Sequence, residues 1–587
     1  MAAKTQTKQL DKATLEEIGQ AYHFEGVAMT LGALLTDGTP QPTTLVNLPL
    51  GMLNRHGLVA GGTGTGKTRT VQLLAEGLSA AGVAVFLSDV KGDLTGLLSP
   101  GEPTEKLQQR TEEQGQDWAP AAFPVQPLSL GETSDTAPGA PIRATVTDLG
   151  PILLSRALEL NQTQSQSLQL IFSWADQRGL ELVDLKDLKA VVSWLTDEGK
   201  AELKDLGGVS TQTAGVILRA VSTLEAQGGD VFFGEPAFDP ADLLRAADGR
   251  GIISILEMND LMNRPALASA FLMWLLAALF EGLPEVGDAD RPKLVFFFDE
   301  AHLLFTGASK EFLASIVQTV KLIRSKGVGI VFITQTPKDV PADVLGQLGT
   351  RIQHALRAFT PDDKKALRAT ADTFPESAFD VEELLTSLGT GEAIVTTLDP
   401  KGRPTPSAPT RIWAPASVMG PATPEAVSQA VAASPLQAKY GTRVERDTAF
   451  EDLQDGVIGN LAESSPASAG GGQGANTEGK PAGQGDGAAS QSGDTASDSV
   501  SATAQDAHEK ARLELEAKRL ELQIRQQEAK EAAAARKDAA AAERAARAEA
   551  KARANSPLNK ALTSFLRSAG TQVAREITRG VFGSRRR

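Results

Sequence analysis

The sequence predicts an α/β fold in which a mostly parallel β-sheet is covered by helices on both faces. Two observations favour this fold. First, strands that are apolar throughout alternate with helical segments, as is typical of a parallel sheet that is buried on both sides. The clearest of these strands are 83–87, 251–256, 294–298 and 328–334. Second, a glycine-rich turn at 61–66 joins a short apolar strand at 58–60 to a predicted helix at 68–81.

Further elements of the predicted core follow in the second half of the chain. Helices are expected at 265–282 and 309–325, and strands at 352–356 and 393–398. The longest uncharged apolar run, Ala266 to Phe280, is shorter than the roughly 18–20 residues that a membrane span needs. We therefore expect a buried helix here and no integral membrane span.

Composition and periodicity divide the chain into successive segments. Residues 100–145 are rich in Pro, Gly, Gln and Glu and are expected to form a loop-rich excursion, whereas the apolar spacing from 151 to 229 is helical. The predicted units are a short β-containing N-terminal segment at 1–50, an α/β core at 51–100 and 236–420, a loop-rich and helical insertion at 101–235, and a C-terminal extension with a disordered linker at 421–505.

Two helices are expected after the linker. Between Leu461 and Leu513, Val500 is the only large aliphatic residue, so no core can form there. Residues 506–555 are expected to form a charged, Ala-rich helix; because leucines fade in its second half, a solvated single helix is favoured over a strong coiled coil. Residues 556–587 carry seven basic residues against one acid and are expected to form a basic amphipathic terminal helix.

The composition excludes several classes of protein. The net charge of −15 means that any contact with DNA must be local. The absence of cysteine excludes disulfides, cysteine-ligated zinc, iron–sulfur clusters and thiol catalysis. The N-terminus, Met1 to Lys8, is polar and has no apolar segment typical of a secretion signal. We expect a cytoplasmic protein.

A phosphate-binding loop is the most specific motif in the chain. It matches G-x-x-x-x-G-K-[ST] with the residues Gly61, Gly62, Thr63, Gly64, Thr65, Gly66, Lys67 and Thr68. The glycines let backbone N–H groups turn onto the phosphates, and the helix that begins here adds its N-terminal dipole. Lys67 is expected to bind the β- and γ-phosphates of ATP, and the hydroxyl of Thr68 to bind Mg²⁺.

Two neighbouring carboxylates follow the apolar strand 294–298. The strand is expected to hold Asp299 and Glu300 at the carboxyl edge of the sheet, beside the phosphate loop. Asp299 would hold the metal ion, and Glu300 would orient and deprotonate the attacking water. A phosphotransferase that uses a bound acceptor does not need this second acid, so the pair favours an enzyme that hydrolyses ATP.

Polar residues at both ends of the next strand extend the candidate site. Gln335 follows the strand 328–334 and suits a sensor of the γ-phosphate in ATPases that have an extra strand between the phosphate loop and the acidic strand. Arg324 precedes the same strand and is the candidate for an arginine finger that reaches a neighbouring subunit. A surface arginine that interacts with a helix C-terminus is the alternative. Arg351 is the second candidate for the finger.

Three charged residues follow the second strand of the core, at the edge that borders the predicted nucleotide site. Asp89, Lys91 and Asp93 either support the metal shell or are solvated loop residues. The sequence does not decide between these two roles.

Together these motifs resemble the FtsK–HerA superfamily, and more narrowly the bacterial YjgR-type, HerA-like proteins. The resemblance covers residues 25–420 and the last thirty residues. Its motifs are Asn54-Arg55-His56-Gly57-Leu58 before the phosphate loop, Asp89-Val90-Lys91-Gly92-Asp93, Phe298-Asp299-Glu300-Ala301-His302, Lys326-Gly327-Val328-Gly329, Thr334-Gln335-Thr336-Pro337 and Arg351-Ile352-Gln353-His354-Ala355-Leu356-Arg357.

The resemblance implies a RecA-like fold with the extra strand, a hexameric ring, ATP hydrolysis between subunits and double-stranded DNA in a central channel. It also implies the roles of individual residues: Lys67 and Thr68 for phosphate and metal, Asp299 for metal, Glu300 as base, Gln335 as sensor and Arg324 as the finger in trans. The chain departs from archaeal HerA because it has only a short β stretch ahead of the core, and its linker and charged helix are additional. Members of that family usually act with a nuclease partner, and these departures mean that the sequence gives no support for such a partner here.

Two hypotheses from different classes follow. The leading hypothesis is a ring-shaped, ATP-hydrolysing motor that translocates double-stranded DNA. The alternative is an ATP-dependent assembly or scaffold protein that does not move DNA. Stimulation of ATP hydrolysis by DNA distinguishes the two.

Overall fold

The computed structural model describes residues 12–133, 138–202, 208–258, 265–287, 289–358, 360–375 and 377–454. The expected linker, charged helix and basic terminal helix lie outside these residues.

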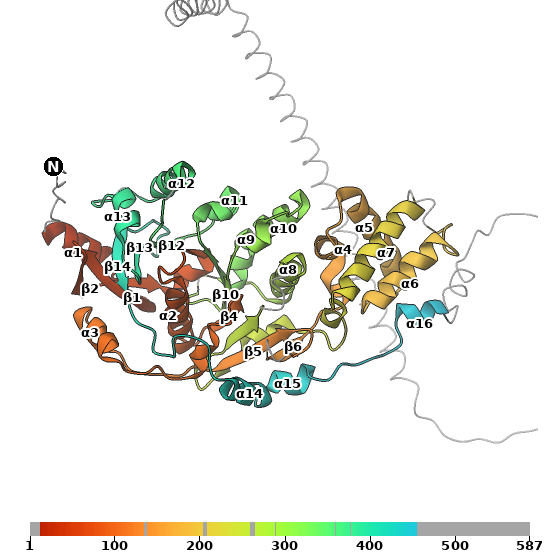
Figure 1. Cartoon of the computed structure of the whole chain (residues 1–587), viewed down its shortest axis with the longest axis horizontal. Coiled ribbons are helices and arrows are strands. Elements are labelled where there is room, and N and C mark those ends of the chain that lie inside the picture. Colours follow the sequence, from red (N-terminus) through yellow and green to blue (C-terminus); the bar gives the residue numbers. More distant parts are fainter. Residues whose placement is uncertain are drawn as a thin grey trace, which may run out of the picture. The chain divides into compact units, whose positions relative to one another are not determined.

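A single large sheet organises the described part of the chain (Figure 1). Its twelve strands have the order β2-β1-β14-β13-β12-β3-β11-β10-β4-β9-β5-β6, and the eight from β12 to β6 are parallel. In chain order these eight are β3 (Gly57–Ala60), β4 (Ala84–Asp89), β5 (Val125–Leu130), β6 (Ala140–Ile142), β9 (Ile253–Glu257), β10 (Leu294–Phe298), β11 (Val328–Thr334) and β12 (Thr350–His354). The predicted mostly parallel α/β fold is confirmed.

The other four strands extend the sheet in antiparallel fashion. They are β13 (Glu392–Thr396), β14 (Ala408–Ile412), β1 (Ala28–Thr36) and β2 (Thr39–Pro49). The N-terminal β segment therefore pairs with β14 and belongs to the same sheet as the core strands. After α1 (Lys12–Ala21), the buried Tyr22 hydroxyl donates to the carbonyl oxygens of Val395 and Pro406, at 2.8 and 2.7 Å. Two-residue strands, β7 (Ala246–Ala247) and β8 (Arg250–Gly251), form a separate ribbon.

The segment at 100–145, expected to be loop-rich, contains more regular structure than its sequence indicates. It forms α3 (Glu105–Glu113) and the strands β5 and β6. Pro127 and Pro141 lie inside these strands and obscured them, because proline is typical of strand ends and turns. Pro141 lies in β6, the edge strand of the sheet, where proline is best tolerated. Pro127 of β5 pairs with β9 but precedes the residues that pair with β6.

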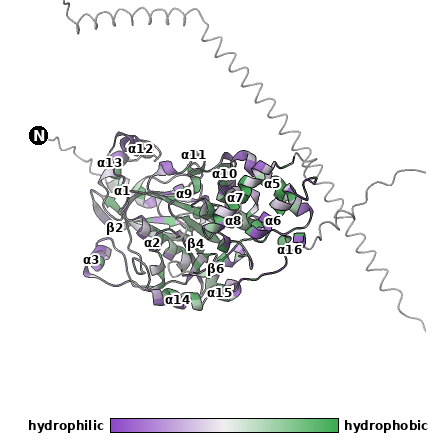
Figure 2. Cartoon of the chain, turned by 45° about the vertical axis from the view of Figure 1, so that its right-hand side comes forward, coloured by the Kyte–Doolittle hydropathy of each residue, from purple (hydrophilic) through white to green (hydrophobic). Residues whose placement is uncertain are grey.

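Helices pack on both faces of the parallel strands, because alternate residues of each strand belong to different cores. On one face, Val85 and Phe297 pack with α2 (Lys67–Ala80). On the other face, Phe86 and Phe296 pack with α8 (Pro265–Gly282) and α10 (Lys310–Ile323). The hydropathy colouring in Figure 2 shows hydrophobic residues gathered around α8 and β4.

The apolar helix α8 is buried, as the sequence predicts. It is long and apolar enough to cross a membrane, the one such helix among the described residues, but 67% of it lies inside the fold. Its large side chains belong to the same core as residues of the sheet, and the helix packs against α4 of the helical insertion. Its hydrophobicity is therefore accounted for by packing in the core.

The helical insertion shares the core of the α8 face. It consists of α4 (Val146–Ala157), α5 (Gln162–Gln177), α6 (Leu185–Thr196) and α7 (Thr211–Ala226). The segment after the sheet forms α14 (Pro424–Ala432), α15 (Pro435–Tyr440) and α16 (Ala449–Gln454), and runs from β5 to the insertion (Figure 1). There the buried Asp187 of α6 accepts hydrogen bonds from the Thr448 hydroxyl and the Phe450 N–H, at 2.6 and 3.0 Å.

Short helices complete the edge of the sheet where the parallel strands end. They are α9 (His302–Phe305), α11 (Ala342–Leu345), α12 (Pro361–Ala371) and α13 (Val381–Ser387). The strand β11 lies between β3 and β10, so an additional strand separates the phosphate-loop strand from the acidic strand. This is the arrangement expected of a RecA-like core with the extra strand.

Candidate ATPase site

The phosphate loop has a backbone that only glycine allows. Gly61, Gly64 and Gly66 have φ angles of 153°, 76° and 113°. A Cβ atom on Gly61 would lie 2.5 Å from Cβ of His354, and one on Gly66 would lie 2.9 Å from the amide nitrogen of Gly391. Both the conformation and the close packing below the loop therefore require glycine at these positions.

The loop is held by the ends of the neighbouring strands. The N–H of Gly61 donates to the carbonyl of Thr334 at 3.2 Å, and the N–H of Gly62 donates to that of Ala355 at 2.9 Å. The N–H of Gly391 donates to the carbonyl of Thr65 at 2.9 Å. These bonds fix the loop against β11, β12 and the turn before β13.

His354 supports the loop from beneath, a role that sequence reasoning did not assign although the residue lies in one of the family motifs. Its Nδ1 donates to the carbonyl of Glu392, so its Nε2 accepts from the hydroxyl of Thr70; both distances are 2.9 Å. The ring is fully buried, and burial lowers the pKa of His354 to about 4, with the charge of Lys67 acting in the same direction. The imidazole is therefore neutral at neutral pH.

Lys67 and Thr68 begin helix α2 directly after the loop. The ammonium of Lys67 donates to the carbonyls of Gly61 and Gly62, at 2.6 and 3.2 Å. Burial lowers the pKa of Lys67, as does the neighbouring charge of Lys91, while the acidic pair opposes both effects. Thr68 is half-buried in the first turn of the helix, at the position predicted for a metal-binding hydroxyl.

Asp299 lies at the end of β10, beside β4 on one side and β11 on the other. Its N–H donates to the hydroxyl of Ser88 at 3.1 Å, and its Oδ1 accepts from the N–H of Glu300 at 2.9 Å. Burial raises the pKa of Asp299 to about 6; the ammonium of Lys91 opposes this shift and the carboxylate of Glu300 adds to it. A cation bound here would relieve the cost of holding two carboxylates together.

Glu300 has an unusual backbone and a sheltered side chain. Its φ of 47° is in the left-handed region, and its side chain is only 11% exposed. Oε1 lies 3.3 Å from Nζ of Lys91, and Oε2 lies 3.4 Å from Nδ1 of His302. Within the described structure, Oε2 is buried and has no hydrogen bond, so this carboxylate oxygen retains the capacity to accept one from a water molecule.

Gln335 lies at the same edge as the acidic pair. Residue Thr334, at the end of β11, pairs with Ala60, the last residue before the phosphate loop. The Thr334 hydroxyl donates to Asp339 and fixes the turn that follows. Gln335 is the next residue and its side chain is exposed, which is compatible with the predicted sensor role.

The two arginine candidates occupy different environments. Arg324 caps α10 at the opposite end of β11 from Gln335 and is exposed. At about 3.3 Å per residue, the strand separates the two ends by roughly 20 Å, so Arg324 cannot serve the phosphate site of its own chain. Arg351 is half-buried and donates to the carbonyl of Thr373 at 3.1 Å.

The charged residues of the loop after β4 occupy different environments. The carboxylate of Asp89 is buried and accepts from the N–H groups of Lys91, Gly92 and Leu94, at 3.1, 2.8 and 2.9 Å. Asp89 therefore shapes the loop. Lys91 pairs with Glu300. Burial lowers the pKa of Arg69, and the negative charge of Asp93 opposes this shift.

Sequence comparison relates the chain to helicases. Residues 35–510 match the family described as "Helicase HerA-like C-terminal". Proteins named "DNA double-strand break repair helicase HerA" from Sulfurisphaera tokodaii and Sulfolobus acidocaldarius are each 26% identical to this chain over 151 residues. Those residues are 25% of this chain and 29% of each relative, so the match spans less than a third of the relatives' length.

Among solved structures, the bacterial conjugative coupling protein TrwB gives a TM-score of 0.45 at 15% identity, covering 69% of this chain and 95% of that one. The family match, by contrast, covers most of this chain and includes the phosphate loop, the acidic pair, Arg324 and Gln335. The chain therefore belongs to the Helicase HerA-like C-terminal family of P-loop ATPases.

Proposed function

We propose that the chain is an ATP-driven motor that works as a ring and translocates double-stranded DNA. The observation that carries the proposal is the pair of carboxylates at the end of β10. Asp299 has a pKa raised to about 6, and Glu300 beside it keeps one buried oxygen without a hydrogen bond. Such a pair, at the same sheet edge as the phosphate loop, suits hydrolysis rather than nucleotide binding alone.

Different residues of the site would bind the phosphates and the metal ion. The loop N–H groups and the ammonium of Lys67 bind the phosphates of ATP. The Thr68 hydroxyl and Asp299 offer the hard oxygen ligands that suit Mg²⁺, which would neutralise charge on the phosphates. Among the described residues, no group of three or more Asp, Glu, His or Cys side chains is placed to hold a metal ion by itself. Mg²⁺ at a nucleotide site takes most of its ligands from phosphate and water.

Glu300 is the proposed base. Its free Oε2 would accept a hydrogen bond, and then the proton, from the attacking water, while Oε1 stays paired with Lys91. Gln335 lies at the adjacent strand end, where the side chain can respond to the presence of the γ-phosphate.

The position of Arg324 supports a ring. It is exposed at the amino end of β11, about a strand length from its own phosphate loop. A second copy of the chain that presents its phosphate site to this face would receive the guanidinium and use it to stabilise the transition state. We propose a hexamer on the basis of the family resemblance.

Double-stranded DNA is the proposed substrate, because the two HerA relatives are named as double-strand break repair helicases. We place the motor in the cytoplasm. The test is the rate of ATP hydrolysis by the full chain with and without a DNA duplex. Stimulation by the duplex supports the motor, whereas an unchanged rate would favour the ATP-dependent assembly protein.

A further inference from the structure

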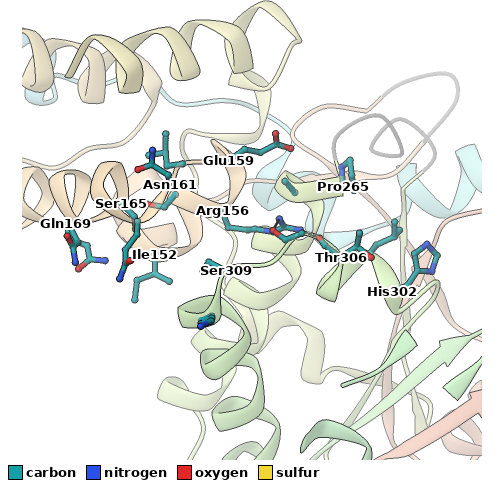
Figure 3. A pocket seen from close by; sticks show the side chains of 18 residues that line it. Ile152, Arg156, Glu159, Asn161, Ser165, Gln169, Pro265, His302, Thr306 and Ser309 are labelled. Atoms are coloured by element: carbon teal, nitrogen blue, oxygen red, sulfur yellow. Dashed lines mark hydrogen bonds between the residues drawn. The ribbon is translucent and has the colours of Figure 1, made fainter. Parts of the chain in front are cut away.

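A groove of about 920 Å³ lies between the helical insertion and the segment that follows the acidic strand (Figure 3). One wall comes from the end of α4 and the first half of α5, including Asn161, Ser165 and Gln169. The opposite wall is the segment 302–310, which includes His302. None of the nucleotide-site roles assigned above uses this groove.

Most of the lining residues carry hydrogen-bonding side chains, while Ile152, Leu160 and Leu303 add apolar surface. Asn161, Gln162, Gln166 and Gln169 present four amides from the start of α5. Arg156 and Lys310 add two cations, and Glu159 is the one carboxylate among the described residues that line the groove. These side chains give the groove one net positive charge, whereas the whole chain has a net charge of −15.

This chemistry suits one class of ligand. Protein contacts to the DNA backbone come largely from Arg, Lys, Ser, Asn and Gln side chains, which bind phosphate and sugar oxygens. Single strands bind on aromatic platforms, and protein partners are anchored by aromatic side chains. The lining residues include no Phe, Tyr or Trp, which argues against both of these occupants.

Two further features lie at the wall of the groove. The N-terminus of α5, a helix of 16 residues capped by Asn161, is at its wall, so the positive end of the helix dipole favours an anion there. The hydroxyl of Ser155, a lining residue that is 5% exposed, has no hydrogen-bond partner within the described structure. A buried polar group without a partner is costly unless a ligand or water satisfies it.

The groove is connected to the catalytic base. The guanidinium of Arg156 donates to the carbonyls of Thr306 and Gly307, at 2.8 and 3.0 Å, and thereby joins the two walls. On the second wall, Nδ1 of His302 lies 3.4 Å from Oε2 of Glu300. A ligand that displaces this wall would therefore move a direct neighbour of the base.

We propose that this groove binds the phosphate backbone of double-stranded DNA, and that its occupation is communicated to Glu300 through the segment 302–310. The inference rests on the proposed function, since it assigns the site at which the motor contacts its substrate. It predicts that DNA affinity depends on α5 and Lys310.

The test measures binding of a fluorescently labelled DNA duplex of mixed sequence to the full chain over a series of salt concentrations. Gln166→Glu combined with Gln169→Glu places two negative charges in the groove and should weaken binding roughly tenfold. Lys310→Gln should reduce the slope of log affinity against log salt by about one, because one phosphate contact is lost. Gln166→Lys should strengthen binding, a gain that misfolding cannot produce.

A matched control makes the same charge change outside the groove. Gln177→Glu combined with Gln227→Glu lies on exposed positions of the same insertion, and should bind the duplex as the unaltered chain does. If the unaltered chain binds the duplex and every groove variant matches this control, the groove assignment is wrong and the proposed motor stands. If the unaltered chain does not bind the duplex at all, both proposals fail.

Discussion

Nζ of Lys91 lies 3.3 Å from Oε1 of Glu300, so the loop after β4 supplies a cation to the proposed catalytic base on β10. The carboxylate is 11% exposed and the ammonium is 50% exposed. Oε2 has no hydrogen bond within the described structure and lies 3.4 Å from Nδ1 of His302, so the ion pair through Oε1 is the closer of the two contacts that orient the carboxylate. Lys91 therefore acts as a positioning residue for Glu300.

Replacing Lys91 should impair turnover more than nucleotide binding. We expect Lys91→Met to lower kcat about tenfold and to leave KM for ATP nearly unchanged, because the base loses its orientation while the phosphate loop is intact. Lys91→Arg should restore part of the rate. Steady-state ATPase assays on the full chain give both constants.

The same idea predicts non-additivity. If Lys91 acts through Glu300, Lys91→Met should not weaken ATP binding in a chain that already carries Glu300→Gln. A loss of ATP affinity in the double variant would instead show that Lys91 contacts ATP directly.

Lys67 and Glu300 should fail in different ways. Lys67→Ala should abolish ATP binding or turnover, because it removes the ammonium that we propose binds the phosphates. Glu300→Gln should bind ATP and retain it unhydrolysed, because Asp299 and Thr68 are untouched while the base is lost. Binding of a fluorescent ATP analogue, followed by analysis of the bound nucleotide, separates the two. Equal loss of binding in both variants would overturn the role of Glu300.

The elements that could be predicted from the sequence are those whose signal is local. The phosphate loop, Gly61 to Thr68, combines a fixed spacing with a strand before it and a helix after it. The unbroken apolar run of β10 predicts a buried strand that ends at Asp299 and Glu300. Helix α8 was recognisable as a core helix from its length and its hydrophobicity.

Other features depend on contacts between residues that are distant in the chain. Nothing near Lys91 in the sequence indicates that it meets Glu300, and nothing near Asp187 indicates that Thr448 bonds to it. The strands β5 and β6 were not predicted, because their prolines are typical of loops. They are strands because they pair with each other and, through β5, with β9. His354 supports the phosphate loop only because the fold places it directly against Gly61, where there is no room for a side chain.

The buried His354 predicts a dependence of stability on pH. Its pKa falls from 6.5 in the unfolded chain to about 4 in the folded protein. Between these values the unfolded chain binds more protons, so stability is lost as the pH decreases from 6.5 towards 4. The contribution is on the order of 3 kcal/mol at the acid end of this window.

Thermal unfolding curves recorded across this pH range test the prediction. The Tm of the unaltered chain should decrease as the pH is lowered through the window, and His354→Gln should show a shallower decrease from a lower starting value. His23→Gln is the matched control, because His23 is exposed, and its curve should keep the original slope. Parallel slopes for all three proteins would contradict the assignment to His354.

Arg324 provides the test of catalysis between subunits. A chain with Arg324→Ala should be inactive alone, because each of its interfaces lacks a guanidinium, and a chain with Glu300→Gln should be inactive because each lacks a base. In a mixed ring, some interfaces pair the intact base of one subunit with the intact arginine of its neighbour. We therefore expect mixing to restore part of the ATPase rate, limited by the fraction of such interfaces.

Arg351→Ala mixed with Glu300→Gln serves as the comparison, because Arg351 already bonds to Thr373 within its own chain. Rescue by Arg324→Ala, with none by Arg351→Ala, would assign the finger to Arg324. The structure gives a reason to expect this outcome. Arg324 is exposed at the end of β11 that is remote from the phosphate loop of its own chain, so it could reach only the phosphate loop of a neighbouring subunit. If rings shown by light scattering to be mixed remain inactive, Arg324 does not act in trans, and the proposed coupling between subunits must rest on another residue.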